Sequence, residues 1–163
     1  MKALESSIAV DPSLVILDLS AKDSADAIRQ LGERMVAGGY VRDTYVAAVL
    51  SREETFPTGL EFPLCGVALP HGEPDGVAKA AVAIGRCSKP VAFRCMDDNS
   101  KTVPVTLIAM LAVSQPESHL DVIGRLIGIF SDEGCCRDVL DIDNADEIAG
   151  LIDKRINVRE AVS

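Results

Sequence analysis

The chain has 163 residues, of which 48% are hydrophobic and 25% charged, and it contains 12 Gly and 8 Pro. This length and composition fit one globular domain and exclude collagen, coiled-coil and low-complexity proteins. A net charge of -9 disfavours nucleic acid and anionic membranes as partners and favours a protein with a basic surface. No apolar stretch approaches the ~20 residues of a membrane span and the N-terminus lacks a signal-peptide core, so we expect a soluble, cytoplasmic protein.

The first predicted elements are a short apolar segment and a helix. The apolar segment falls within residues 8–19. The helix is capped by Asp23 or Ser24 and ends at Gly38 and Gly39. The apolar residues that repeat at helical spacing inside it are Ala27, Ile28, Leu31 and Met35.

A second helix is predicted from Val41 to about Leu50, followed by a segment of irregular pattern and then by strands. Residues 51–63 contain two prolines and a glycine, so we expect a loop or a short strand there. Four later segments rich in Val, Ala and Ile are apolar almost throughout, which is typical of strands covered on both faces. These segments are residues 66–70, 80–85, 90–93 and 103–113.

The C-terminal third returns to a helical pattern. A helix begins near Pro116, with Ser114 as a candidate cap, and two shorter helices are expected over residues 132–140 and 144–152. The apolar side of the first of these helices consists of Leu120, Ile123, Ile127 and Phe130. The whole pattern predicts an α/β fold with one domain, in which a mixed β-sheet is flanked by helices on both faces.

The cysteines and aromatic residues favour neither a disulfide-stabilised fold nor a sugar-binding site. The five cysteines include no CxxC pair, so we expect them to be reduced and expect no zinc site. They are Cys65, Cys87, Cys95, Cys135 and Cys136. With 4% aromatic residues and no Trp, the chain has few side chains on which a sugar ring would stack.

His71 has the local sequence of a presented side chain. It follows a strand-like segment and lies between Pro70, which fixes φ and removes a backbone donor, and Gly72, which allows a sharp turn. An imidazole held in this way suits proton transfer, metal ligation or phosphorylation on nitrogen. An ordinary histidine in a surface turn is the structural alternative.

The remaining candidate chemistries have weaker sequence support. His119, the second histidine, lies at the start of a helix, where it can also be a cap or a surface residue. No metal-binding HExxH, GxSxG elbow, Walker A or GxGxxG motif occurs. A Cys–His hydrolase remains formally open because Cys65 lies six residues before His71, although a strand cysteine is more commonly a small buried apolar residue.

Four motifs that follow one another along the chain resemble the IIA component of the bacterial sugar phosphotransferase system, in its fructose–mannitol (type-2) superfamily. They are the SREE sequence containing Arg52, the PTGLE segment, the apolar strand leading into PHG, and the SHLDVIGRL helix start. The resemblance runs from about residue 13 to 155, and the segment REETFPTGLE is similar to the galactitol-type branch of the family.

This resemblance implies a phosphoryl relay without a cofactor. The phosphocarrier HPr would donate to a histidine, which passes the group to a cysteine of the cognate IIB component, working with a IIC permease. By position, His71 matches the phosphorylated histidine, His119 the second active-site histidine, and Arg52 the arginine near the phosphoryl site. On its own, Arg52 is equally consistent with a cation that complements a helix C-terminus.

Two features depart from the family pattern, and two other functions stay open. Cys65 stands where several branches carry a glutamate, so a role of that carboxylate is either missing or taken by Glu61. The sequence also has PHG where part of the galactitol-like group has PHT. A regulatory protein whose phosphorylation state selects a target protein is the main alternative to sugar uptake, and a domain with an inert His71 is a more distant one.

Overall fold

The computed structural model of the protein describes residues 7–157. In chain order the elements are η1 (Pro12–Leu14), β1 (Val15–Leu19), α1 (Ser24–Ala37), α2 (Asp43–Thr55), β2 (Gly59–Glu61), β3 (Gly66–Ala68), β4 (Ala81–Arg94), β5 (Thr102–Ala112), η2 (Pro116–Ser118), α3 (His119–Ser131), α4 (Glu133–Asp141) and α5 (Ala145–Ile156). Within the described range, no helix has both the length and the apolar character that a membrane span needs.

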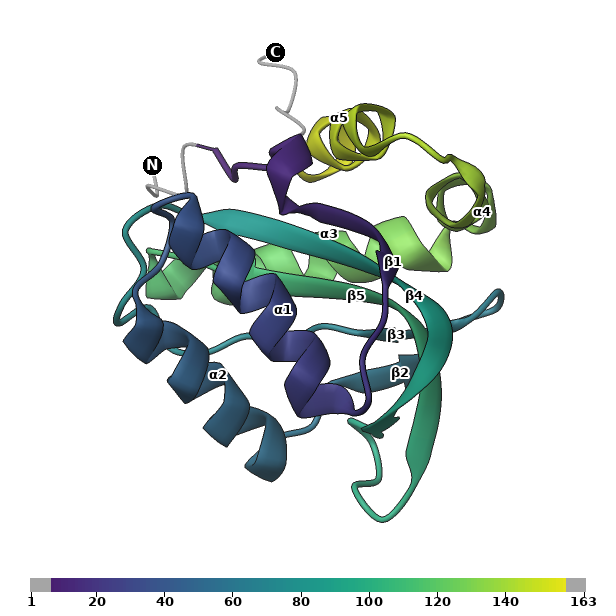
Figure 1. Cartoon of the computed structure of the whole chain (residues 1–163), viewed down its shortest axis with the longest axis horizontal. Coiled ribbons are helices and arrows are strands. Elements are labelled where there is room, and N and C mark those ends of the chain that lie inside the picture. The colour runs from purple at the N-terminus through teal and green to yellow at the C-terminus, as the bar shows by residue number, and fades with distance from the viewer. Residues whose placement is uncertain (1–6, 158–163) are drawn as a thin grey trace.

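The five strands form one mixed sheet in the order β1-β4-β5-β3-β2. β1 is parallel to β4 and β3 is parallel to β5, whereas β4–β5 and β2–β3 are antiparallel. Helices α1 and α2 pack on one face of the sheet, and α3, α4 and α5 pack on the other (Figure 1). The predicted single-domain α/β fold with helices on both faces is therefore confirmed.

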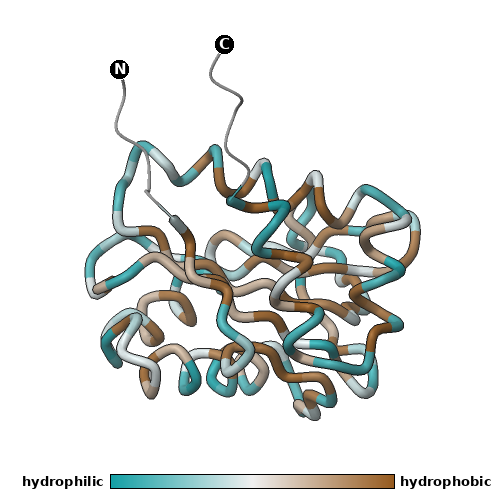
Figure 2. The backbone as a smooth tube through the Cα atoms, turned by 90° about the horizontal axis from the view of Figure 1, so that it is seen from above, coloured by the Kyte–Doolittle hydropathy of each residue, from teal (hydrophilic) through white to brown (hydrophobic). Residues whose placement is uncertain are grey.

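The strand β5 shows why its sequence is apolar almost throughout. Leu107 and Leu111 belong to the core shared with α3, α4 and α5. Ile108 and Met110, one residue out of phase, belong to the core shared with α1 and α2. Successive side chains of a strand point to opposite faces, and here both faces are buried. The hydrophobic segments accordingly run through the middle of the molecule, and the hydrophilic ones mark mostly outer turns (Figure 2).

Two segments predicted as separate strands, residues 80–85 and 90–93, are parts of the single strand β4. The register between β4 and β5 shifts between Arg86 and Val91, where the sequence is polar. Arg86 donates to the carbonyls of Leu17 at 3.1 Å and Ile142 at 2.7 Å, so it ties the end of α4 to β1. The residues between the two predicted segments therefore belong to a continuous but irregular strand.

The ends of the helices agree with the prediction for α1 and differ for α2 and α3. The Asp23 side chain caps α1 by accepting the Asp26 N–H at 2.8 Å, and Gly38 is its C-cap. α2 runs to Thr55, about five residues beyond the predicted end. Ser114 does not occupy an N-cap position, because Gln115 precedes the turn η2 and Ser118 precedes α3.

Leu120 does not belong to the buried side of α3, contrary to the prediction. Its side chain is 84% exposed, although it lies in the first turn of an apolar helix. The buried residues of α3 are Val122, Leu126, Ile129 and Phe130. The stripe that faces the sheet is thus rotated away from Leu120, which is left at the surface beside His119.

Candidate active site

His71 and His119 come together because β3 and β5 are neighbouring parallel strands. His71 follows β3 and forms a parallel bridge with Leu111 near the end of β5, while the Leu111 N–H donates to the Pro70 carbonyl at 2.9 Å. The chain then leaves β5 and enters α3 at His119. Loops that follow parallel strands meet at the carboxyl edge of the sheet, where many α/β proteins place their sites.

The two imidazole rings are in direct contact. Their centroids are 4.8 Å apart and the planes are nearly perpendicular, at 86°. His71 Nδ1 lies 2.7 Å from the Leu69 carbonyl oxygen. A carbonyl only accepts, so this contact places the proton of neutral His71 on Nδ1 and leaves a lone pair on Nε2. The ring is therefore oriented with Nε2 as its nucleophilic atom.

Arg52 approaches the same site from the last turns of α2. Its guanidinium lies 4.9 Å from the centroid of the Phe56 ring and 3.5 Å, at Nη1, from Glu73 Oε1. Glu73 is 74% exposed, so this ion pair is weak. The positive charge of Arg52 lowers the pKa of both histidines, whose rings touch each other, so the structure brings together the three residues singled out from the sequence, namely His71, His119 and Arg52.

Two buried nitrogen atoms at the site have no hydrogen-bond partner among the described residues. They are Nε of Arg52 and Nε2 of His119. Buried polar groups are nearly always satisfied, so such orphan atoms need a physical reason. Both can present an N–H to an anion, and the oxygens of a phosphoryl group are acceptors of the required kind.

Burial keeps both histidines neutral near pH 7. It lowers the pKa of His71, chiefly because an imidazolium is poorly solvated there. The Leu69 hydrogen bond raises that pKa, whereas the charge of Arg52, and that of His119 when it is protonated, lower it. Burial also lowers the pKa of His119, against an opposing effect of Glu73. A neutral His71 keeps the lone pair that a nucleophile requires.

The backbone N–H of Gly72, just after His71, already has a hydrogen-bond partner. This N–H donates to the Tyr45 hydroxyl at 3.0 Å, and that hydroxyl donates to the Leu111 carbonyl at 2.6 Å. Burial raises the pKa of Tyr45 to about 12, so the phenol stays protonated. Tyr45 therefore anchors the turn after His71, a role that the sequence pattern did not reveal.

Replacing Tyr45 with Phe is expected to destabilise the fold by about 1–3 kcal/mol, because Leu111 and Gly72 would each keep a buried polar group without its partner. The urea midpoint of unfolding measures the change. Tyr40, which is only partly buried, provides the matched Tyr→Phe control. Equal midpoints for the Tyr45 variant and the wild type would contradict the assignment.

Glu61 and Cys65 lie away from His71. Glu61 pairs with Gly66 at the start of β3, whereas His71 follows the end of that strand. Burial raises the pKa of the Cys65 thiol to about 12, so it is not a thiolate near pH 7. Neither Glu61 as a replacement carboxylate nor a Cys65–His71 hydrolase pair fits this geometry.

Sequence reasoning missed the buried pair Glu53 and Thr58. Glu53 Oε2 accepts the Thr58 N–H and Oε1 accepts the Thr58 hydroxyl, both at 2.8 Å. The available signal was spacing, because Glu53 continues the buried stripe of Tyr45 and Val49 at intervals of four residues.

In residues 7–157 no group of three or more His, Cys, Asp or Glu side chains is placed to hold a metal ion.

Known proteins are similar to this chain in sequence and in fold. Residues 9–155 match the family described as phosphoenolpyruvate-dependent sugar phosphotransferase system, EIIA 2. The galactitol-specific EIIA component of Escherichia coli K12 is 32% identical over 110 residues, covering 68% of this chain and 73% of that protein. The ascorbate-specific EIIA component of Shigella dysenteriae is 30% identical, covering 93% and 96% respectively.

Solved structures of IIA proteins have the same fold as this chain. In the complex of Escherichia coli IIA mannitol with phosphorylated IIB mannitol, a chain with 30% identity superposes with a TM-score of 0.70, covering 86% of this chain and 94% of that one. The crystal structure of IIA mannitol from Escherichia coli gives a TM-score of 0.67 at 28% identity, covering 87% and 97%. The chain therefore belongs to the EIIA 2 family of the phosphoenolpyruvate-dependent sugar phosphotransferase system, a family of phosphotransfer proteins.

Proposed function

We propose that His71 accepts a phosphoryl group from phospho-HPr and passes it to a cysteine of a cognate IIB component. The observation that carries this proposal is the arrangement around one ring: Nδ1 of His71 is fixed by the Leu69 carbonyl, and two unpartnered nitrogen donors, on Arg52 and His119, lie at the same site. This is the arrangement required of a neutral nitrogen nucleophile that receives a dianionic group.

The transfer needs no water and no cofactor. As the N–P bond of the donor histidine breaks, a bond forms between phosphorus and Nε2 of His71; in the second step that bond breaks as a thiolate of the acceptor attacks. Such transfers pass through a loose transition state whose charge is spread over the equatorial oxygens, so positioning and positive charge supply most of the catalysis. Arg52 provides the charge, and His119 provides a second N–H.

The surface beside the site suits a protein partner. Leu120, next to His119, is 84% exposed, and Phe56, under the Arg52 guanidinium, is 58% exposed. Exposed apolar side chains grouped around a reactive atom are typical of a protein contact surface. This favours exchange between proteins over binding of a sugar to this chain.

The sugar-uptake role and the galactitol-like assignment rest on relatives. The relatives include galactitol-specific, mannitol-specific and ascorbate-specific EIIA proteins, each about 30% identical in its matched region. Among them, the galactitol-type protein agrees with the branch indicated by the REETFPTGLE segment. We place this chain in the cytoplasm, beside a IIC permease for a polyol of that kind.

A regulatory role is the second candidate. The nitrogen regulatory protein IIA-Ntr from Neisseria meningitidis superposes on the chain with a TM-score of 0.67 at 25% identity. Both functions use the same phosphohistidine and differ in the acceptor. Transfer from the phosphorylated chain to the cysteine of a galactitol-type IIB favours uptake, whereas phosphorylation without transfer to any IIB favours regulation.

The test is phosphorylation of the purified chain with phosphoenolpyruvate, enzyme I and HPr. We expect intact-mass analysis to show one added phosphoryl group that is lost in acid, because phosphohistidine is acid-labile, and peptide mapping to place it on residue 71. Omitting HPr serves as the control. An unmodified chain in the complete mixture, with a known EIIA phosphorylated alongside it, would refute the proposal.

His119→Ala is expected to accept the phosphoryl group but to pass it on about 10- to 100-fold more slowly, because one N–H donor to the moving oxygens is lost while the nucleophile stays. Single-turnover transfer from the phosphorylated variant to IIB measures this effect. His119→Gln, which keeps an N–H donor, is the matched variant and is expected to recover part of the rate. Wild-type rates for His119→Ala would show that this ring only packs against His71.

A further inference from the structure

The backbone just before His71 is held by the side chain of Thr58, which lies one residue beyond the paired residues of β2 and β3. β2 and β3 pair through Gly59 and Ala68, and the next step of this register places Thr58 opposite Leu69. There the Leu69 N–H donates to Thr58 Oγ1 at 3.2 Å. The threonine side chain thus continues the contact between the two segments where the backbone ladder stops.

Glu53 fixes the direction of the Thr58 hydroxyl. Its two carboxylate oxygens accept the backbone N–H and the hydroxyl of Thr58, both at 2.8 Å. When Glu53 is ionised, its Oε1 only accepts, so the hydroxyl proton of Thr58 points to Glu53 and an oxygen lone pair remains for the Leu69 N–H. Both side chains are buried, with Glu53 8% and Thr58 3% exposed. Burial of a carboxyl group with a complete set of partners indicates a specific role for those hydrogen bonds.

Leu69 connects this network to the reactive ring. Its N–H is bound to Thr58, and its carbonyl oxygen lies 2.7 Å from Nδ1 of His71. The position of that carbonyl determines which nitrogen of His71 carries the proton and where Nε2 points. We propose that Glu53 and Thr58 are positioning residues that, through Leu69, fix the tautomer and orientation of His71 for the phosphoryl transfer proposed above.

The helix α2 supports this role from both sides of His71. Its buried stripe contains Tyr45, whose hydroxyl accepts the N–H of Gly72, the residue just after His71. The same stripe contains Glu53, which holds Thr58 and through it Leu69, two residues before His71. Buried side chains of one rigid helix therefore fix the short segment that presents the imidazole. Positioning residues on rigid elements hold a reactive group more accurately than a loop does alone.

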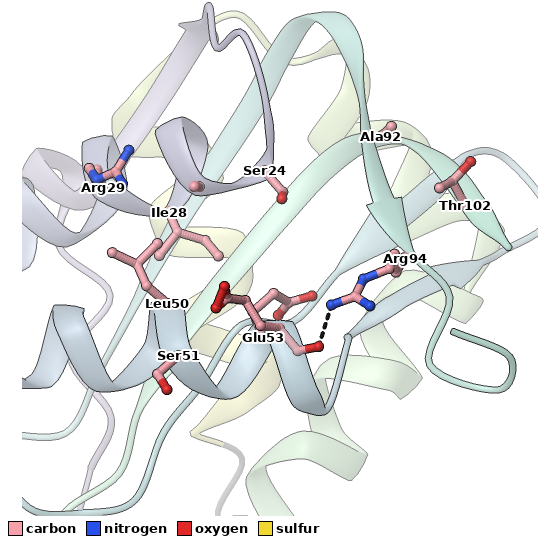
Figure 3. Close-up of a pocket in the computed structure, with 11 residues that line it drawn as sticks. Ser24, Ile28, Arg29, Leu50, Ser51, Glu53, Ala92, Arg94 and Thr102 are labelled. Atoms are coloured by element: carbon pink, nitrogen blue, oxygen red, sulfur yellow. Dashed lines mark hydrogen bonds between the residues drawn. The ribbon is translucent and has the colours of Figure 1, made fainter. Parts of the chain in front are cut away.

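The outer side of Glu53 is not packed against the core. It borders a pocket of about 370 Å³ between α1, α2 and β4, which Arg94 also lines (Figure 3). The Arg94 guanidinium is itself held by the Glu54 carbonyl. Burial raises the pKa of Glu53 to about 7, while its bonds to Thr58 and the charge of Arg94 oppose that rise. Replacement of Glu53 by the isosteric Gln thus leaves the packing of the core in place.

The test compares Thr58→Val, which keeps the shape but removes the hydroxyl, with Thr58→Ser, which keeps the hydroxyl. In protein labelled with ¹⁵N-histidine, the ring nitrogen shifts of His71 report its tautomer without any donor protein. The rate constant and KM for phosphorylation by phospho-HPr give the second readout. Glu53→Gln is measured in the same way and supplies the test if Thr58→Val does not fold.

We expect Thr58→Val and Glu53→Gln to shift His71 from the Nδ1–H form toward a mixture of tautomers. The phosphorylation rate constant should fall about tenfold with KM for the donor unchanged, and Thr58→Ser should stay within about twofold of the wild type. Folded Thr58→Val and Glu53→Gln variants with wild-type ring shifts and rates would overturn the proposal. If wild type itself accepts no phosphoryl group, the proposed function fails, yet the tautomer measurement still decides whether Glu53 and Thr58 position His71.

Discussion

His71→Gln is expected to accept no phosphoryl group from phospho-HPr under conditions that fully modify the wild type. The glutamine side chain keeps a polar group of similar reach at the end of β3, but its amide nitrogen has no lone pair available for attack on phosphorus. His71 contacts His119 and borders Arg52, and neither of these takes over as an acceptor in the proposed mechanism. Intact mass and acid lability measure the outcome, and modification of His71→Gln to the wild-type extent would contradict it.

The pH dependence of labelling provides a second check on His71. Since burial lowers the pKa of His71, the ring is mostly neutral above that pKa, and the labelling rate constant should be level from about pH 7 to 8. The rate should fall in acid as the ring gains a proton and loses its nucleophilic lone pair. An isolated histidine, with its higher pKa of about 6.5, would begin to lose rate at a higher pH. Controls with a different EIIA separate this effect from titration of the donor.

The sequence was sufficient for the fold where the local signals agreed with one another. In α1 the cap at Asp23, the apolar repeat and the final Gly38 all point to the same helix, and the structure has it there. The long apolar segment that became β5 is buried on both faces, as its composition indicates. Such elements are specified locally, so periodicity and caps are enough to find them.

The sequence was less informative where long-range contacts decide the structure. The two apolar segments on either side of Arg86 were predicted as separate strands, yet β4 continues because its residues from Val91 onward pair again with β5. Arg86 itself has carbonyl partners that are distant in the sequence. Leu120 fits the apolar side of α3 by period, but docking of the helix on the sheet selects a different stripe. The angle at which a helix packs on a sheet cannot be predicted from a local sequence pattern.

In the candidate site, too, some features could be predicted from local sequence and others depend on long-range contacts. The Pro70–His71–Gly72 sequence presents an imidazole, and this could be predicted from the special backbone properties of proline and glycine. Tyr45 could not be predicted, because it is 27 residues from its partner Gly72 and resembles an ordinary core aromatic. Glu53 lies in the part of α2 that extends beyond the predicted end of this helix. The candidate nucleophile His71 was found from local sequence, and His119 and Arg52 were found from the family resemblance. Tyr45 and Glu53, which hold the segment around His71, were found only from the fold.

Arg52 offers the second large effect, and two variants separate its possible roles. If Arg52 stabilises charge on the transferring group, Arg52→Gln should slow phosphorylation about 10²–10³-fold, the magnitude expected when a donor to developing charge is removed. If it only complements the C-terminal end of α2, the same change should cost about 0.3–1 kcal/mol of stability and leave the rate intact. The partly exposed ion pair with Glu73 adds little to stability in either case.

Arg52→Lys distinguishes charge from geometry. Lysine keeps the positive charge near the end of α2 but lacks the planar fork and the Nε atom, which in Arg52 is buried without a partner. We therefore expect Arg52→Lys to recover only a small part of the rate lost in Arg52→Gln while matching the wild type in its urea midpoint. Glu73→Gln is the control for the ion pair and should change the rate less than about threefold. Full recovery by lysine would show that charge alone acts on the phosphoryl group, and wild-type rates in Arg52→Gln would remove Arg52 from the reaction.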